Sequence, residues 1–177
     1  MDTTFSYLVG LAAYATLVIG AFAYGARAAE LASVTQTMQG KTSPLFGVAI
    51  PTGYRQWEMV AISYEAPFDE FRGILGNPAA VKAYEDGTLP FPDGSILAKL
   101  AWKRIPSSEF DGAFVPGRAT TVQIMVKNSK KYASTDGWGF GRFVDRTPAD
   151  EAQHRTCFAC HRANVKNHDD VFTRYVP

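Results

Sequence analysis

The chain has 177 residues, 46% of them hydrophobic, so it is long enough to bury the core of one domain. Its 18 lysines and arginines, set against 17 aspartates and glutamates, give a formal net charge of +1. This balance excludes the broad basic surface of a nucleic-acid-binding protein, and we expect no nucleic-acid partner.

An uncharged apolar segment occupies residues 5–26. It ends in Ala26-Arg27-Ala28, a small-x-small pattern typical of signal peptidase sites. No basic residue precedes it, and it passes the roughly 18 residues that span a membrane. We therefore predict that residues 1–29 are a signal peptide or an N-terminal membrane anchor. Either interpretation predicts a periplasmic protein, held at the inner membrane only if residues 5–26 are retained.

The next segment, 30–53, is rich in serine, threonine, glycine and proline and is predicted to be an irregular lead-in. A single folded domain is predicted over 54–177. Within it, residues 54–62 and 71–75 alternate aromatic or β-branched side chains with polar ones, which indicates half-buried strands.

A short helix is predicted over 79–85. Asn77 is a good N-cap, Pro78 suits the first turn, and Gly87 can adopt the left-handed conformation that ends a helix. The turn that follows leads into a third predicted strand, 95–102.

Two more strands are predicted over 120–126 and 138–144, on either side of a lysine-rich turn. A last helix is predicted to begin at Thr147-Pro148, with Asp150 and Glu151 in its first turn. Strands with short connections, a few short helices and a helical C-terminal segment predict an α+β domain, mainly antiparallel sheet. The period-two pattern in the middle of the chain excludes a four-helix bundle.

Both cysteines of the chain lie in one motif, Cys157-Phe158-Ala159-Cys160-His161. In an oxidising compartment the pair is compatible with a disulfide loop or a thioredoxin-like redox pair, but neither explains His161. A zinc site would need two further ligands at suitable spacing. The complete motif is typical of covalent c-type haem attachment.

Haem attachment gives each residue of the motif a role. The thiols of Cys157 and Cys160 add across the haem vinyl groups, and the imidazole of His161 then lies below the ring, within reach of the iron. We therefore predict one covalent haem c, with Cys157, Cys160 and His161 as its binding residues and His161 as the metal ligand.

Further segments share their order and spacing with one family. They are Tyr54-Arg55-Gln56-Trp57, Phe91-Pro92-Asp93-Gly94-Ser95-Ile96-Leu97-Ala98-Lys99, Val126-Lys127-Asn128-Ser129 and, after the cysteine motif, Val171-Phe172-Thr173-Arg174-Tyr175. The set resembles the cytochrome P-460 family, and the likeness extends from Tyr54 to Tyr175.

The resemblance implies a mostly antiparallel β fold, a homodimer and a haem iron open on its distal side to small nitrogen compounds. One branch of the family oxidises hydroxylamine, in part with nitric oxide, to nitrous oxide, and would need an electron-accepting cytochrome. The other branch, the β-type cytochromes c′, binds nitric oxide or carbon monoxide beneath apolar side chains. A third interpretation, plain electron transfer, requires a sixth iron ligand.

The resemblance also implies three catalytic positions. Lys99 matches the lysine that cross-links to the haem edge in the oxidising branch, and Arg72 matches an arginine of the distal pocket. Gln123 takes the place of a distal glutamate that accepts protons. A glutamine amide cannot take up a proton near neutral pH, so this replacement weakens the enzymatic interpretation.

Simpler interpretations of the same residues stay open. Lys99 can be a solvated strand lysine, because lysine is rarely buried without a partner. Arg72 can be an exposed arginine or an ion-pair partner of Glu70 or Asp69.

Other side chains are weaker candidates. Aromatic side chains that can cover the haem are Phe68, Phe71, Phe91 and Phe114. Methionines that can supply a sixth ligand are Met38, Met59 and Met125. We expect His154 to lie at the surface or near a haem propionate, and His168 to take no part.

Overall fold

The structure is a computed structural model, and it describes residues 38–176. The long strands are β3 (Glu58–Glu65), β4 (Glu70–Gly76), β5 (Ile96–Pro106), β6 (Phe114–Lys127) and β7 (Trp138–Val144). The short strands are β1 (Met38–Gln39), β2 (Ile50–Pro51) and β8 (Thr147–Pro148). The α-helices are α2 (Pro78–Glu85) and α3 (Glu151–Val165), and the 3-10 turns are η1 (Tyr54–Gln56), η2 (Ala66–Phe68), η3 (Ala133–Thr135) and η4 (Lys166–His168).

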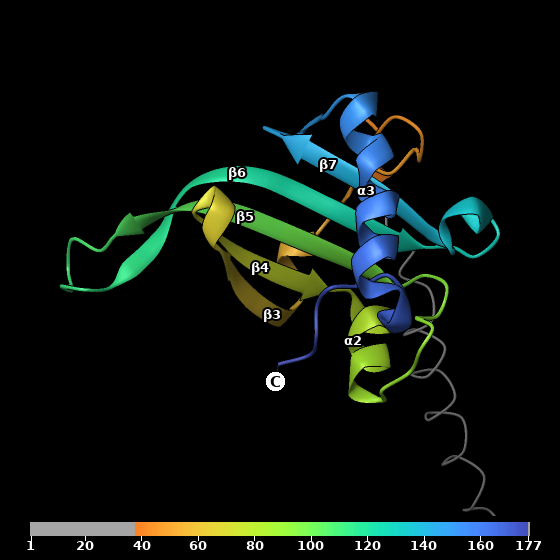
Figure 1. The fold of residues 1–177 in the computed structure, drawn as a ribbon, viewed down its shortest axis with the longest axis horizontal. Helices are drawn as coiled ribbons and strands as arrows, with labels where there is room; N and C mark the ends of the chain where they lie inside the picture. The colour runs from red at the N-terminus through yellow and green to blue at the C-terminus, as the bar shows by residue number, and fades with distance from the viewer. Residues whose placement is uncertain (1–37, 177) are drawn as a thin grey trace, which may run out of the picture. The chain divides into compact units, whose positions relative to one another are not determined.

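The main sheet has six strands in the order β3-β4-β5-β6-β7-β8, and every neighbouring pair is antiparallel. Strands adjacent in the chain are therefore adjacent in the sheet, as short connections dictate. Figure 1 shows α3 in front of the sheet, α2 at one end of it, and the β5–β6 hairpin extending beyond the other strands. The predicted α+β fold, mainly antiparallel sheet with a helical C-terminal segment, is confirmed.

The two faces of the sheet have different surroundings, because successive side chains of a strand point to opposite sides. On β5, Ala98 and Leu100 belong to a core cluster with Val48, Ile50 and Phe143. The residues that alternate with them face the other way: Leu97 belongs to a second cluster, with Trp138, Phe140 and Val171. Lys99 shares that second face.

Helix α2 begins as the sequence predicts. The Asn77 side chain accepts a hydrogen bond from Ala80 N at 3.0 Å, and Pro78 occupies the first turn. The same Asn77 oxygen accepts from Ile96 N at 2.9 Å, and the amide donates to Gly94 O at 2.8 Å. The cap therefore also joins the helix to the start of β5.

Several element boundaries differ from the sequence prediction: β5 and β6 form a longer hairpin, Ile96–Pro106 and Phe114–Lys127, than the predicted 95–102 and 120–126. Two further differences have a local cause. The strand predicted from Tyr54 begins at Glu58, because Tyr54–Gln56 forms the 3-10 turn η1 after Gly53 at φ +74°. Thr147–Pro148 is not a helix start, because it pairs with β7 as β8. Helix α3 begins after Asp150, whose side chain accepts from Gln153 N at 2.8 Å.

The core extends further toward the N-terminus than Tyr54. In the predicted lead-in, Val48 is fully buried and Ala49 nearly so, although regular structure there is limited to two-residue strands. Ser43 Oγ donates to Phe140 O at 2.8 Å and accepts from Val48 N at 3.1 Å. Irregular backbone here is held by side-chain hydrogen bonds and burial.

The predicted signal peptide or anchor, residues 1–29, lies outside the described residues. Within residues 38–176, neither helix has the length and apolar character needed to cross a bilayer.

Candidate functional site

Helix α3 presents the cysteine motif. Positions 157, 160 and 161 are spaced three and four residues apart, so their side chains lie on one face of the helix. The two cysteines are not joined by a disulfide: Cys157 packs against the second core cluster, and Cys160 is exposed. Burial raises the pKa of the Cys157 thiol, and the positive charges of Arg142 and Lys99 oppose this shift.

His161 is held by the chain that follows α3. Its Nδ1 donates a hydrogen bond to the carbonyl of Asp170 at 2.7 Å, which leaves the lone pair on Nε2. The ring packs against Phe140 and Phe172, with centroids 5.1 and 4.9 Å away. Burial lowers the pKa of His161, so the imidazole is held in the neutral form that binds metals.

A cavity of about 690 Å³ opens between α3, the C-terminal segment and the sheet. All six site residues predicted from the sequence line it: Cys157, Cys160, His161, Lys99, Arg72 and Gln123. Much of the remaining lining is apolar, including Ile74, Leu97, Met125, Phe140, Val171 and Phe172. The volume and the mainly apolar lining are those of a cofactor pocket.

Lys99 and Gln123 are cross-strand neighbours in this cavity. Lys99 on β5 pairs with Gln123 on β6, and Gln123 pairs in turn with Arg142 on β7. Antiparallel partners point to the same face, so the three side chains form one polar row across the sheet. The Gln123 amide donates to Thr121 Oγ1 at 3.2 Å.

Lys99 is partly buried in the cavity wall. Burial lowers its pKa to about 8, and the charges of Arg72 and Arg142 add to this shift. The ammonium group is therefore partly deprotonated near neutral pH, unlike that of a solvated lysine.

Arg72 on β4 is held by two carboxylates. It forms ion pairs with Glu70, at 3.1 Å, and with Glu65. Glu70 is thus one predicted partner, whereas Asp69 pairs with Arg104 at 2.6 Å instead. The Arg72 Nε is buried and has no hydrogen-bond partner among the described residues, so it is a donor available to a group in the cavity.

Three contributors to the site were not predicted from the sequence. Arg142 and Glu65 line the cavity, and Glu65 is the single carboxylate among the lining residues. Neither had a local signal, because strand pairing brings Arg142 beside Gln123 and an ion pair brings Glu65 to Arg72. The Asp170 carbonyl had no signal, because it is a backbone group that tertiary structure brings to His161.

Only some of the side chains predicted to cover the haem or to supply a sixth ligand line the large cavity. Phe68 lines the cavity, whereas Phe71, Phe91 and Phe114 do not. Met125 lines it, and Met59 lies outside it with 49% of its surface exposed. The side chain of Met38 lies outside the described part of the structure.

The prediction for His154 was wrong. The side chain is fully buried, its Nε2 accepts from Arg142 N at 3.0 Å, and its Nδ1 donates to Asp150 O at 2.8 Å. It fastens the start of α3 to β7. The sequence could not show this, because the backbone donor comes from a different element.

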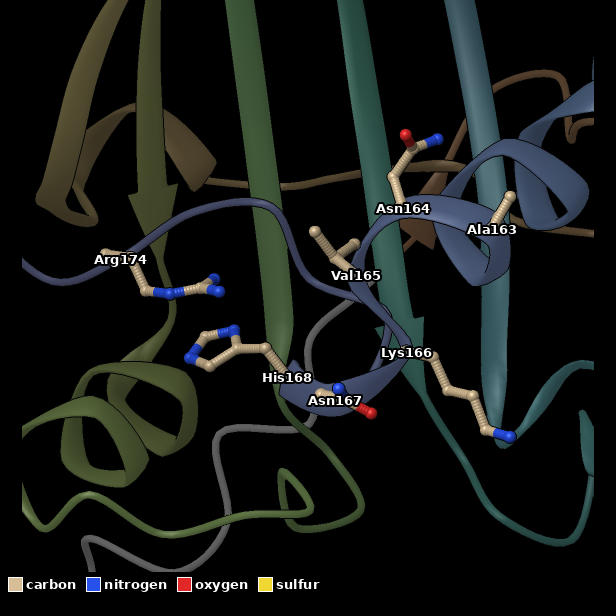
Figure 2. A pocket seen from close by; sticks show the side chains of 7 residues that line it. All are labelled: Ala163, Asn164, Val165, Lys166, Asn167, His168 and Arg174. Atoms are coloured by element: carbon tan, nitrogen blue, oxygen red, sulfur yellow. The ribbon is translucent and has the colours of Figure 1, made fainter.

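A second, smaller hollow of about 240 Å³ lies where α3 ends. Figure 2 shows His168 and Arg174 on the chain that turns back there, with Lys166 directed away from them. His168 lines this hollow and not the large cavity, and its Nδ1 donates to Val171 O at 2.9 Å. No residue of the cysteine motif lines it.

The residues of the large cavity fit a haem. The two thiols can attach a porphyrin through its vinyl groups, and the neutral imidazole, with its second nitrogen already hydrogen-bonded, can ligate the iron. The unpartnered Nε of Arg72 and the positive charges of Lys99, Arg142 and Arg174 suit the acidic edge of a porphyrin. Cys157, Cys160 and His161 would hold the group.

Fold and cavity together define a class of protein, an antiparallel β domain that binds a cofactor between its sheet and a C-terminal helix. Comparison with protein families makes this specific: the cytochrome P460 family matches residues 51–173. The chain belongs to the cytochrome P460 family and is therefore a haem-binding cytochrome. A search of curated proteins found no match.

Proposed function

We propose that the protein is a mono-haem c-type cytochrome that binds small nitrogen compounds at an open distal iron site and oxidises hydroxylamine towards nitrous oxide. One observation carries the proposal. The cavity that holds Cys157, Cys160 and His161 also contains a row of polar side chains, including Lys99 and Gln123. An apolar sheet face would suffice merely to hold a haem.

Haem bound here would supply iron that coordinates a small ligand and takes electrons from it. The chain's own residues orient that ligand and handle its protons. The buried Arg72 guanidinium, fixed by Glu65 and Glu70, can donate a hydrogen bond from Nε. The Gln123 amide can donate or accept one.

Lys99 has two proposed uses. With a pKa of about 8, part of its amine is neutral and can accept a proton at neutral pH. A neutral amine is also the form that can bond to the haem edge, as in the oxidising branch that the sequence resembles. We propose this cross-link for Lys99: the new nitrogen–carbon bond would replace one amine N–H bond and one ring C–H bond, and the two electrons released would pass to the external electron acceptor.

A second candidate function is reversible binding of nitric oxide or carbon monoxide, without turnover. The identity of residue 123 favours it. Gln123 cannot accept a proton near neutral pH, and hydroxylamine must lose protons as it is oxidised. In this case Arg72 and Gln123 would only shape the binding site.

The proposal also includes the location of the protein and its partners. The uncharged apolar segment 5–26 and the small-x-small pattern at residues 26–28 favour export to the periplasm. The protein would stay anchored in the membrane only if that segment is retained. An external cytochrome would accept the electrons, and the resemblance implies a homodimer.

The test is spectroscopy and mass measurement on the purified protein. An intact mass increased by one haem is expected, and a denatured spectrum shifted from that of ordinary haem c would indicate the Lys99 cross-link. Hydroxylamine turnover with an artificial electron acceptor tests the enzyme. Reversible nitric oxide uptake without turnover would select the second candidate. A low-spin spectrum insensitive to added ligands would contradict both and indicate electron transfer.

A further inference from the structure

The end of β6 carries a buried ion pair outside the large cavity. Lys127 Nζ lies 2.7 and 2.9 Å from the two carboxylate oxygens of Asp169, and the two side chains are only 5% and 9% exposed. The same ammonium donates to Asp136 O at 2.9 Å and lies 4.9 Å from the ring centroid of Trp138. All of its donors have nearby acceptors, which a buried charge requires.

Asp169 is attached to the rest of the fold at two further points. Its carboxylate accepts a hydrogen bond from Phe91 N at 2.9 Å. Its backbone carbonyl accepts one from Trp138 Nε1 at 2.7 Å. Asp169 is therefore connected to β6, to β7 and to the loop that precedes β5.

The backbone at this point needs such support. Asp169 and Asp170 both adopt left-handed conformations, at φ +51° and +58°. Consecutive non-glycine residues rarely do so, and surrounding interactions must hold them. Figure 2 shows the turn of Lys166, Asn167 and His168 that leads into this pair.

Asp170 then presents its carbonyl to His161. The Nδ1 of His161 donates to that oxygen at 2.7 Å. A hydrogen bond from the second nitrogen of a ligating histidine fixes the tautomer and ring orientation and raises the donor strength of the imidazole.

We propose that the buried pair of Lys127 and Asp169 positions His161, by fixing the backbone whose Asp170 carbonyl binds Nδ1, and thereby sets the donor strength of the imidazole toward the haem iron. Both residues are positioning residues, since neither lines the cavity. The inference rests on the proposed function to the extent that His161 is the iron ligand.

The test uses full-length, haem-loaded protein and the variant Asp169→Asn. The amide keeps the size of the side chain and an acceptor for Phe91 N but loses the ionic bond to Lys127. Because the Asp170 carbonyl is then less firmly held, the reduction potential should shift to a more positive value. The iron–histidine stretching frequency of the ferrous protein should fall.

Two further variants separate positioning from general stability. Lys127→Arg keeps the charge and should stay close to wild type in both quantities. Asn77→Ala removes a buried cap whose side-chain hydrogen bonds go to Ala80, Gly94 and Ile96 and not to residues 166–172, and should lower stability without moving either quantity. An unshifted Asp169→Asn, or an equal shift in Asn77→Ala, would overturn the proposal.

Amide hydrogen exchange gives a reading that does not involve iron. The amides of residues 166–172 should exchange faster in Asp169→Asn than in wild type or Asn77→Ala. Equal protection in all three proteins would contradict the proposed role of the Lys127–Asp169 pair. A wild-type protein without haem would defeat the proposed function. A haem-loaded wild type with an unshifted Asp169→Asn would defeat this inference alone.

Discussion

The cavity has two walls that are built in different ways. The helix wall consists of Cys157, Cys160 and His161 on α3, and its spacing is a local property of one helix. The sheet wall consists of Arg72, Lys99, Gln123 and Arg142, which come from four strands and meet through antiparallel register. The comparison teaches that the proposed attachment residues and the proposed reactive residues depend on different levels of structure. A change on one wall should therefore leave the function of the other measurable.

The largest effect should come from the helix wall. In a Cys157→Ala/Cys160→Ala variant no thioether can form, and we expect covalent haem in the denatured protein to fall to the fraction that a Lys99 cross-link alone retains. Denaturing electrophoresis with haem staining and intact mass are the measurements. Arg72→Gln, on the sheet wall, should retain covalent haem. Equal haem loss in both variants would remove the distinction between the walls.

The next effect should be a gain on the sheet wall. Gln123→Glu introduces a carboxylate beside Lys99, where it can accept protons from bound hydroxylamine. General-base catalysis contributes roughly 100-fold or more, so kcat should rise by about that factor if proton removal limits the rate. Steady-state assays with an artificial acceptor measure it.

Gln153→Glu is the matched control, because Gln153 also lines the cavity but lies on α3. It should leave kcat close to wild type. A similar rise in both variants would show that any added negative charge is sufficient.

Arg72→Gln should have a smaller effect of opposite sign. It removes a charged hydrogen-bond donor from the cavity, and such bonds contribute about 1.5–3 kcal/mol. Nitric oxide affinity or kcat/KM should fall about 10- to 100-fold. Arg104→Gln, which breaks the ion pair with Asp69 outside the cavity, should change neither. Unaltered ligand binding in Arg72→Gln would exclude the guanidinium from the site.

The last effect is on stability and disappears at high pH. In double-alanine protein prepared without haem, Lys99→Met should raise the free energy of unfolding, because the native chain no longer buries an ammonium group. The pKa of Lys99 falls from 10.5 to about 8, which corresponds to at most about 3 kcal/mol.

The sign follows from proton binding. Between pH 8 and 10.5 the unfolded chain holds more protons at Lys99 than the native chain, so native stability rises with pH. The gain from Lys99→Met should therefore be full below pH 8 and vanish by pH 10.5. Urea unfolding at several pH values measures it, and a pH-independent gain would contradict a buried, titrating lysine.

Much of the fold was predictable because its signals are local. The cap at Asn77, the alternation along β5 and the alternation along β7 depend on neighbouring residues, and these elements form as expected. The predicted start of an element was wrong where pairing with another strand determined it. Thr147 and Pro148 pair with β7, and that pairing outweighs the local preference for a helix start.

The site divides in the same way. The sequence by itself determined that Cys157, Cys160 and His161 lie together, because they are neighbours on one helix. Tertiary structure alone decided that Glu65 and Arg142 join Lys99, and that the Asp170 carbonyl meets His161. The physical reason is that strand register and loop closure bring together groups far apart in the chain, and residue spacing carries no record of those contacts.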